Sequence, residues 1–460
     1  MAYAFTTVNF TPADTPPFTE LLGINNVSTI IGTHNQANNA GFFLTLPSTF
    51  VSIPFPAAGD TNLNAVGINN NNVGVGFYMD ANGVTHGFAV QGPASVPVTE
   101  DAPNTAFNQL LGINDASNEV GYSSDMKNGL TDQLAYERLA SGGYLYLDNA
   151  THTLTLPANV NSQATGIDNA GDIVGFYMPT AMTSNGFLLA AGSTKAVPIQ
   201  FPGSTFTQAL GINNHGEIVG FYNDAAGKTH GFTFSQATGT YTEVDAPGAT
   251  ATTVNGVNDN GALVGFDVNA QGNTVGLLAQ STNFTATDLT TGQTSLSAGV
   301  PLGTYTLFSK ITSDSLNITA NVPTAFIVSG TGNDIISAQA GGNNVIDDTG
   351  GTINFEIGGS GKDAFFLDAS KSPVSWNTIA DFHAGDFAVI YGINQQDLAA
   401  HAANGLGVAG FSGLTLETFQ NGGAAFVTFA GRNTSELGSS LATAFGTDPN
   451  GRSFLLVVGT

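Results

Sequence analysis

Short runs of alternating hydrophobic and polar residues fill the first 280 residues, separated by turns rich in glycine and asparagine. In the clearest unit, the runs are residues 209–213, 217–222, 229–234 and 240–244. Alternation with a period of two predicts β-strands, because successive side chains of a strand point to opposite faces of the sheet. The pattern therefore predicts units of four short antiparallel strands.

The tripeptide Gly-Ile-Asn, or a close variant of it, recurs once in each unit. It begins at Gly23, Gly67, Gly112, Gly166, Gly211 and Gly256, at spacings of 44, 45, 54, 45 and 45 residues. A period of about 40–45 residues with four strands per repeat is typical of β-propeller blades. We therefore expect an all-β chain with a six-bladed β-propeller over residues 1–280.

The last unit stops after its third strand, near Gln280, and the N-terminus carries the missing segment. Residues 5–12 precede Gly23 in the way that residues 244–247 precede Gly256. An unpaired strand edge is a site of aggregation, and closing the ring removes it. We expect residues 4–10 to pair with the last blade as its fourth strand.

Two further glycines recur within the units, one in the second strand and one in the third. The expected positions are Gly32, Gly76, Gly121, Gly175, Gly220 and Gly265, and then Gly41, Gly87, Gly143, Gly186, Gly231 and Gly276. Glycine inside a strand marks a close approach of another backbone. We expect both sets to lie where neighbouring blades pack.

Blade three departs from the repeat, because Gly121 and Gly143 lie 22 residues apart, whereas Gly220 and Gly231 lie 11 apart. We place the insertion in residues 123–139. Insertions in repeat proteins map to loops that often carry the binding face. The candidate ligand-binding residues are Asp125, Lys127, Asp132, Tyr136 and Arg138. The alternative is a loop insertion without function.

Residues 168–172, 213–217 and 258–261 resemble loose calcium loops, but we interpret them as hairpin turns that need a positive φ. His86 and His230 share one repeat position, and we interpret them as structural. The units resemble the HAF-type bacterial extracellular repeat over residues 1–280. That resemblance implies a location at the cell surface and no particular reaction.

The charge of the chain limits its partners. The sequence has 34 Asp and Glu against 9 Lys and Arg, a net charge of −25 and no cysteine. This charge repels nucleic acids and anionic lipids and favours cations. The lack of cysteine excludes disulfides and suits a bacterial extracellular protein. Residues 1–10 do not read as a signal peptide, and no stretch is long enough to span a membrane.

Glycine- and aspartate-rich repeats follow the propeller. Residues 329–337 and 358–366 fit the pattern Gly-Gly-x-Gly-x-Asp-x-U-x, where U is apolar and Ser329 replaces the first glycine; residues 340–346 and 349–354 are degraded copies. Glycines can aim backbone carbonyls inward, and aspartate supplies an anionic oxygen, which are ligands that Ca²⁺ prefers. The candidate metal-site residues are Gly330, Gly332, Asp334, Gly342, Asn344, Thr352, Gly359, Gly361 and Asp363.

These repeats resemble the calcium-binding β-roll of RTX-type bacterial exoproteins over residues 325–370. The resemblance implies stacked coils in which turns two apart share a Ca²⁺ ion. It pairs Asp334 with the Thr352 turn and Asn344 with Asp363. Each pair has lost one carboxylate, so we expect few ions and modest affinity. The alternative is a glycine-rich linker.

Residues 376–386 and 453–458 are similar to segments that follow such rolls in substrates of type I secretion. The resemblance implies that residues 371–460 are a β-rich module for the type I export machinery. It also implies an extracellular or cell-surface location and a roll that folds on meeting calcium. Residues 281–324 are expected to form a connector with β-strands.

Three functional hypotheses remain, and the lack of a known catalytic motif makes us lean away from an enzyme. The first is a secreted, calcium-binding structural protein that self-assembles into a surface layer, matrix or filament. The second is a propeller for adhesion to carbohydrate, such as cell-surface polysaccharide. The third is a polysaccharide hydrolase or lyase, which needs a carboxylate pair at the ring centre. Asp172 and Glu217 share one repeat position and are residues to inspect for it, although that position reads as a turn.

Overall fold

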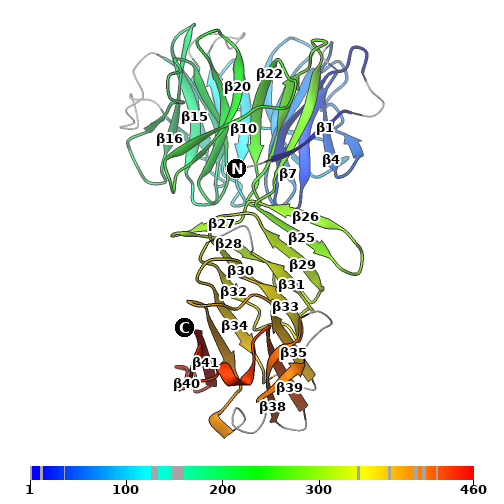
Figure 1. Ribbon diagram of the computed structural model, residues 1–460. Coiled ribbons are helices and arrows are strands. Elements are labelled where there is room, and N and C mark those ends of the chain that lie inside the picture. The colour runs from blue at the N-terminus through cyan, green and yellow to red at the C-terminus, as the bar shows by residue number, and fades with distance from the viewer. Residues whose placement is uncertain are drawn as a thin grey trace. The chain divides into compact units, whose positions relative to one another are not determined.

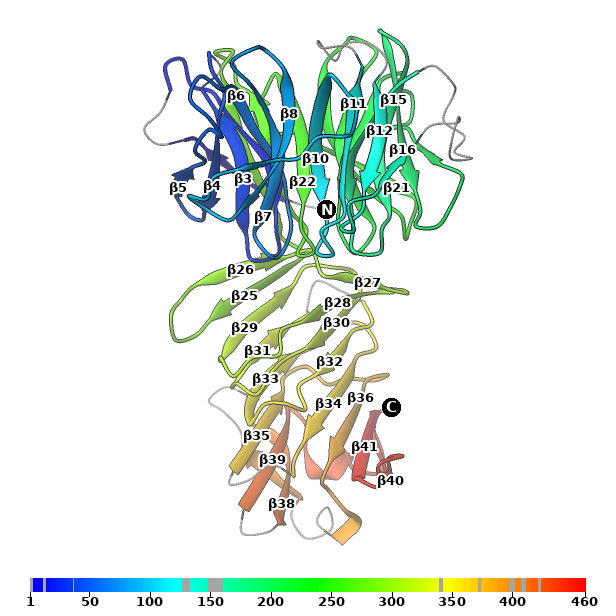
Figure 2. The ribbon, with the colours of Figure 1, turned by 180° about the vertical axis from the view of Figure 1, so that it is seen from behind.

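A computed structural model describes residues 3–10, 14–35, 37–125, 133–147, 160–338, 342–370, 374–396, 402–406, 411–420 and 423–460. These residues form two compact β units, Tyr3–Gln280 and Ser281–Thr460 (Figures 1 and 2). A short 3₁₀ turn spans Thr434–Glu436. In the described part of the chain, no helix has the length and apolar character needed to cross a membrane.

The first unit is a six-bladed propeller of four-stranded antiparallel sheets, as predicted (Figure 1). Blade one contains β2 (Thr19–Ile24), β3 (Thr29–His34), β4 (Ala40–Thr45) and β5 (Thr49–Ser52). Blade two contains β6 (Thr61–Ile68), β7 (Val73–Met79), β8 (Thr85–Gln91) and β9 (Val98–Thr99). Blade three contains β10 (Phe107–Ile113), β11 (Glu119–Ser124), β12 (Leu134–Arg138) and β13 (Tyr144–Tyr146). Blade four contains β14 (Asn161–Ile167), β15 (Ile173–Thr180), β16 (Thr183–Leu189) and β17 (Val197–Ile199). Blade five contains β18 (Thr207–Ile212), β19 (Glu217–Asn223), β20 (Thr229–Ser235) and β21 (Thr240–Val244).

Blade six is completed by the N-terminal strand. Its order is β1 (Tyr3–Val8), β24 (Thr274–Ser281), β23 (Ala262–Val268) and β22 (Ala251–Val257). The side chain of Val8 is buried, and those of Tyr3 and Phe5 pack against the core between blades five and six. The predicted closure of the ring is therefore confirmed.

The first hairpin turn of every blade begins with Asn or Asp, at Asn25, Asn69, Asn114, Asp168, Asn213 and Asn258. Its Oδ1 accepts a hydrogen bond from the backbone N–H four residues later in all six blades. The residue before that donor has a positive φ, between 59° and 89°. These segments are therefore hairpin turns that carry their own side-chain cap, as we interpreted them.

The next residue of each turn ties the blades into a ring. The six residues are Asn26, Asn70, Asp115, Asn169, Asn214 and Asp259. Each backbone N–H donates to Oδ1 of the corresponding residue in the next blade, at 2.8–2.9 Å, and Asp259 donates to Asn26 to complete the circle. The ring therefore has a polar closure at its centre in addition to β1.

The two sets of strand glycines have different roles. A Cβ on Gly231, in the third strand, would lie 2.8 Å from Val254 Cγ2 of the next blade, so this set, apart from Gly143, packs between blades as predicted. Gly220, in the second strand, instead faces the Gln208 carbonyl within its own blade, beside a β-bulge. The expectation for the second-strand set was therefore wrong.

The sequence analysis also assigned Gly143 to the wrong position in blade three, the third strand. In blade five Phe221 pairs with Gly231, and the equivalent partner in blade three is Ala135, which pairs with Tyr122. Gly143 lies in the turn between β12 and β13. Residues 134–138, placed in the insertion from sequence, are a regular third strand.

The second unit is a β-solenoid of two sheets. One sheet contains β25 (Phe284–Asp288), β26 (Thr294–Ser297), β29 (Leu316–Ala320), β31 (Ile335–Ser337), β33 (Ile353–Ile357), β35 (Val374–Ile379), β37 (Ala402–Leu406), β38 (Gly413–Gln420) and β39 (Gly423–Ala430). The other contains β27 (Val300–Leu302), β28 (Tyr305–Ser309), β30 (Ala325–Val328), β32 (Val345–Asp347), β34 (Ala364–Asp368), β36 (Phe387–Tyr391), β40 (Leu441–Thr447) and β41 (Ser453–Gly459).

Parallel pairing runs from β28 through β36 in one sheet and from β29 through β39 in the other. Successive strands alternate between the sheets, so the chain winds in coils around a shared apolar core (Figure 2). The parallel pairing begins at β28, within the predicted connector, and continues beyond residue 370 to β36 in one sheet and β39 in the other. The first coil lacks the glycine–aspartate pattern, and its Leu316 and Ile318 side chains are buried in the core.

Candidate functional site

The predicted metal turns form two hydrogen-bonded stacks along the solenoid. In the first stack, Asp334 Oδ1 accepts from Leu316 N at 2.8 Å, and Asn354 Oδ1 accepts from Asp334 N at 3.0 Å. Thr352 Oγ1 meets Asn333 Oδ1 at 2.8 Å in the same stack. The Asp334 and Thr352 turns therefore lie against each other, in the pairing that the resemblance implied.

The second stack joins Asn344, Asp363 and Asp386. Asn344 Oδ1 accepts from Ala325 N at 2.9 Å, Asp363 Oδ1 accepts from Asn344 N at 2.8 Å, and Asp386 Oδ1 accepts from Asp363 N at 2.9 Å. Each side chain thus supports the backbone of the coil before it. The sequence analysis did not include Asp386 among the metal-site residues, although Asp386 ends the segment 376–386 that resembles the sequence following RTX-type rolls.

Asn344 offers its amide nitrogen to a cage of oxygens. Its Nδ2 lies 2.8 Å from the Gly342 and Gly358 carbonyls, 3.0 Å from Asp363 Oδ1 and 3.3 Å from the Ala338 carbonyl. The bond from Ala325 N fixes this orientation of the amide. The Asn344 amide has two N–H groups, so it cannot donate a separate hydrogen bond to each of these four oxygens. The four oxygens surround Nδ2 in the way that ligands surround a bound cation. Asn344 itself does not fit as an oxygen ligand.

The glycines of the turns allow neighbouring coils to approach closely. A Cβ would lie only 1.8–2.2 Å from a carbonyl oxygen of the preceding coil if one were added at Gly330, Gly332 or Gly361. Gly359 has a φ of +105°, which favours glycine. Gly342 is exposed at its turn. These residues therefore act through the backbone.

Two carboxylates of the stacks retain an unpartnered oxygen. Asp334 Oδ2 and Asp363 Oδ2 are buried and accept no hydrogen bond from the described residues. Burial, reinforced by Asp386, raises the pKa of Asp363 to about 6. The ligand atoms of Asp363, Asp386 and His383 lie within 4.8 Å of one another. Hard oxygen atoms without partners fit a Ca²⁺ ion.

The five blade-three candidates do not converge on one site. Lys127 and Asp132 lie outside the described residues, and Asp125 is exposed just after β11. Tyr136 is fully buried, and its hydroxyl donates to Asn108 Oδ1 at 2.8 Å, so no ligand can reach it. Arg138 bridges Glu100 and Glu119 at 2.7 and 2.9 Å and lines a groove of about 380 Å³.

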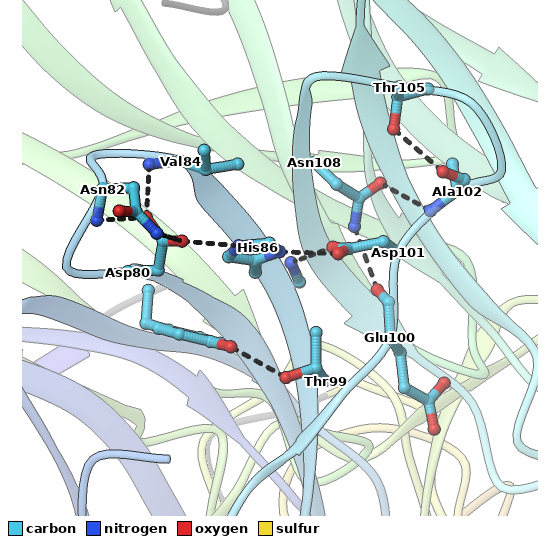
Figure 3. A network of polar contacts seen from close by, with 12 residues as sticks. Asp80, Asn82, Val84, His86, Thr99, Glu100, Asp101, Ala102, Thr105 and Asn108 are labelled. Atoms are coloured by element: carbon cyan, nitrogen blue, oxygen red, sulfur yellow. Dashed lines mark hydrogen bonds and ion pairs between the residues drawn. The ribbon is translucent and has the colours of Figure 1, made fainter. Parts of the chain in front are cut away.

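His86 lies between two aspartates in blade two (Figure 3). Its Nδ1 is 2.6 Å from Asp101 Oδ2, and its Nε2 is 3.7 Å from Asp80 Oδ2. In blade five, His230 repeats this arrangement with Asp245 at 2.7 Å and Asp224 at 3.5 Å. Asp80 also caps its own turn through Val84 N. Both histidines thus connect a turn to the segment that follows the last strand of their blade, which supports a structural role.

The centre of the propeller holds a channel of about 570 Å³. The innermost strand of each blade presents alternate residues to it, such as Gln208, Leu210 and Ile212 in blade five. The polar residues at one level are Glu20, Asn64, Gln163, Gln208 and Thr253, and the aromatic residues are Phe77, Phe176, Phe221 and Phe266. Four of the polar residues are direct cross-strand partners of the four phenylalanines.

The two levels of the channel differ in polarity. The residues that begin the hairpin turns are preceded by Ile24, Ile68, Ile113, Ile167, Ile212 and Val257, which form an apolar level. Next to this level lies a smaller space of about 60 Å³, lined by the asparagine and aspartate residues of the six hairpin turns. The channel therefore combines hydrogen-bonding and aromatic groups with an apolar level and a polar end.

Sequence reasoning missed this channel, although a signal was present. A residue three positions before each Gly-Ile-Asn glycine is polar in all six repeats: Glu20, Asn64, Gln109, Gln163, Gln208 and Thr253. Polar residues at a fixed position of an inner strand predict a polar ring around the axis. Asp172 and Glu217, the pair considered for hydrolysis, are not among the lining residues that the structure describes.

Glu20 is the one carboxylate in the described lining of the channel. Burial raises its pKa from 4.5 to about 7. Because folding raises the pKa of this carboxyl, its ionisation destabilises the folded state. The destabilisation grows as the pH rises from the pKa in the unfolded chain through the pKa in the folded protein. Near neutral pH, Glu20 can therefore both donate and accept hydrogen bonds.

Replacing Glu20 by Gln is expected to stabilise the propeller more at alkaline than at acidic pH. The gain should be about 2 kcal/mol larger at pH 8 than at pH 5, because only the ionised carboxylate suffers from burial. Urea unfolding of both proteins at the two pH values measures it. An equal effect at both pH values would contradict the raised pKa.

No family model matches the chain, and no curated protein matches it. Among solved structures, the comparison finds a variant of the Aleuria aurantia lectin with Fucα1-6GlcNAc, at 10% identity, TM-score 0.38, and 65% of this chain and 99% of that chain covered. AofleA from Arthrobotrys oligospora has 9% identity, TM-score 0.39 and coverages of 60% and 86%. TolB from Acinetobacter baumannii has 8% identity, TM-score 0.34 and coverages of 55% and 64%. The six four-stranded sheets of the chain themselves define the propeller.

Proposed function

We propose that this protein is a binding protein whose propeller takes a small, uncharged, hydroxyl-rich ligand of the saccharide class in its central channel. The observation that carries the proposal is the ring of polar side chains around that channel, four of which lie across from a phenylalanine of the neighbouring strand. Amides and a carboxyl exchange hydrogen bonds with hydroxyl groups, and aromatic and aliphatic side chains cover the apolar faces of a sugar.

Size and charge support this ligand class. A channel of about 570 Å³ lies within the range of small-molecule sites, roughly 300–1,000 Å³. The net charge of −25 and Glu20 disfavour phosphorylated or other strongly anionic ligands. Hydrolysis would need a second carboxylate opposite Glu20, and the described lining offers none.

A glycan array followed by calorimetry with the best-binding sugar tests the proposal. Gln163→Ala and Gln208→Ala, which remove amides from the channel, are expected to weaken binding at least about tenfold each, since each removes hydrogen bonds to the sugar. The control is Gln271→Ala, in an exposed turn of blade six, which should bind as the wild type does. No array signal, or equal affinities for all variants, would reject the channel as the site.

We also propose that the solenoid binds Ca²⁺ and that the protein works outside the cell after type I export. The unpartnered Asp334 Oδ2 and Asp363 Oδ2 support the ion, and the RTX-type and HAF-type resemblances support the location. Self-assembly into a surface layer, matrix or filament remains a prediction. Electron microscopy with calcium tests it, and persistent monomers would count against it.

A further inference from the structure

Glu119 occupies a buried position of blade three where four other blades carry an aliphatic residue. It opens β11, two residues before Gly121, and its cross-strand partner is Arg138 on β12. Glu119 is 3% exposed. The residues at the same position of blades one, four, five and six are Ile30, Ile173, Ile218 and Leu263, all at most 2% exposed. An ion pair in place of buried aliphatic residues is weak evidence of a gain in stability, and such departures from a repeat are expected at functional sites.

Glu100 departs from the repeat in the same way. It follows β9, and its backbone N–H donates to the carbonyl of Gly87 in the third strand of blade two. The corresponding residues of the other five blades are Val8, Ile53, Leu147, Ile199 and Val244, all of them buried. The Glu100 side chain points away from the contact between His86 and Asp101 (Figure 3). Two carboxylates thus replace apolar residues where blade two meets blade three.

One basic side chain, Arg138, joins these two carboxylates. Its Nη1 lies 2.7 Å from Glu100 Oε2 and 2.9 Å from Glu119 Oε2, and it donates its hydrogen bond to Glu119. Glu100 Oε2 is buried and accepts no hydrogen bond from the described residues. No further ion pair in that part of the chain involves either glutamate. Burial and then the charge of Glu100 raise the pKa of Glu119. The cluster therefore keeps one carboxylate charge that no basic side chain balances.

The three charged residues line a groove of about 380 Å³ whose other walls are largely aliphatic. Val73 and Val98 are among the lining residues, and Val98 is 64% exposed. The volume lies within the range of small-molecule sites, roughly 300–1,000 Å³. An occupant that complements this groove combines one positive charge with an apolar body.

We propose that the groove binds a small primary alkylammonium ion, whose N–H groups bond to Glu100 and Glu119 and whose hydrocarbon chain lies against the valines. A single positive charge balances the cluster, and an ammonium group supplies the donor that Glu100 Oε2 lacks. A divalent metal ion fits less well, because the groove offers it a guanidinium and aliphatic side chains in place of further oxygen ligands. This site selects a different class of ligand from the channel, so its test is independent of the saccharide proposal.

Calorimetric titration of the full chain with hexylammonium chloride near neutral pH tests the proposal. We expect saturable binding to one site per chain, and no binding of 1-hexanol or hexanoate, which carry a similar chain without the positive charge. Glu119→Gln should weaken hexylammonium binding at least about tenfold, because it removes the unbalanced charge. The matched control is Glu137→Gln, which should bind as the wild type does. Glu137 precedes Arg138 on β12, so its side chain points to the other face of the blade, and it is not among the described lining residues of the groove.

A second variant keeps the test decisive if Glu119→Gln does not fold. Glu100→Val, Glu119→Ile and Arg138→Phe together install the apolar residues of blade five. This triple variant should melt no lower than the wild type and should not bind hexylammonium. Equal hexylammonium affinity in the wild type and either variant, equal binding of 1-hexanol, or no binding to the wild type at millimolar concentration would overturn the proposal. Tighter binding of calcium that is lost in Glu119→Gln would overturn it in favour of a metal site.

Discussion

Deleting residues 1–9 is expected to prevent the propeller from folding stably. The deletion removes β1, leaves the edge of β24 unpaired, and exposes the core that Val8 and Phe5 cover. The loss of buried apolar surface and of one strand ladder should cost roughly 5 kcal/mol or more, a large share of the stability of a typical domain. Circular dichroism and calorimetry of the deleted protein measure the effect.

A synthetic peptide of residues 1–12 provides the control for this deletion. Added in excess, the peptide should restore the melting transition, because it can pair with β24 in place of the missing strand. The same peptide with Val8→Asp should fail, since Val8 is buried. A deleted protein that melts within about 2 °C of the full chain, less than the shift expected for 1 kcal/mol, would show that β1 does not close the ring.

Calcium is expected to raise the melting temperature of the solenoid unit substantially. An ion present at about 100 times its dissociation constant stabilises the folded state by about 2.7 kcal/mol, and a unit of this size shifts by about 2–4 °C per kcal/mol. We therefore expect a shift of about 5–10 °C per saturated site. Differential scanning calorimetry with calcium, and again with EDTA, measures it.

Two controls test whether the shift in melting temperature is specific: magnesium in place of calcium, and the substitution of a carboxylate outside the stacks. Magnesium at the same concentration should give a smaller shift, because it demands a smaller and more regular shell of ligands. Asp448→Asn should keep the full response to calcium, because Asp448 caps the β40–β41 turn and binds Arg452 away from the stacks. Identical curves with calcium and EDTA would refute calcium binding by the solenoid.

The propeller could be predicted from the sequence because each blade repeats the same local requirements. The asparagine that opens the first turn caps that turn, and in Asn213 its Nδ2 also reaches the Asn258 carbonyl of the next blade at 3.0 Å. A residue with two such roles leaves a clear signal at a fixed spacing. The missing last strand of the sixth unit then pointed directly to residues 4–10.

Blade three was harder to align because a turn glycine took the place of a strand glycine in the pattern. Ala135 stands at the position of Gly231, and Tyr136 pairs with Gly121 in the way that Phe232 pairs with Gly220. Tyr136 therefore looked like part of a loop when it is a core residue with a hydrogen-bonded hydroxyl. Spacing alone cannot distinguish the two glycines.

In the solenoid, the pattern identified the stacked turns but not the contents of the core. The Asp334 and Asp363 turns stack as the nine-residue repeat implies. Glu356, which is fully buried on β33, could not be anticipated, because the repeat predicts an apolar residue at its position. The coil from Tyr305 was missed because its own residues lack the glycine–aspartate pattern.

A crystal structure of the full chain with its best-binding glycan tests the central claim most directly. We predict that the sugar lies in the propeller channel, with hydroxyl groups bonded to Glu20 and Gln163 and one face against Phe176. A sugar bound instead on an outer surface of the propeller, such as the groove beside Arg138, would contradict the account.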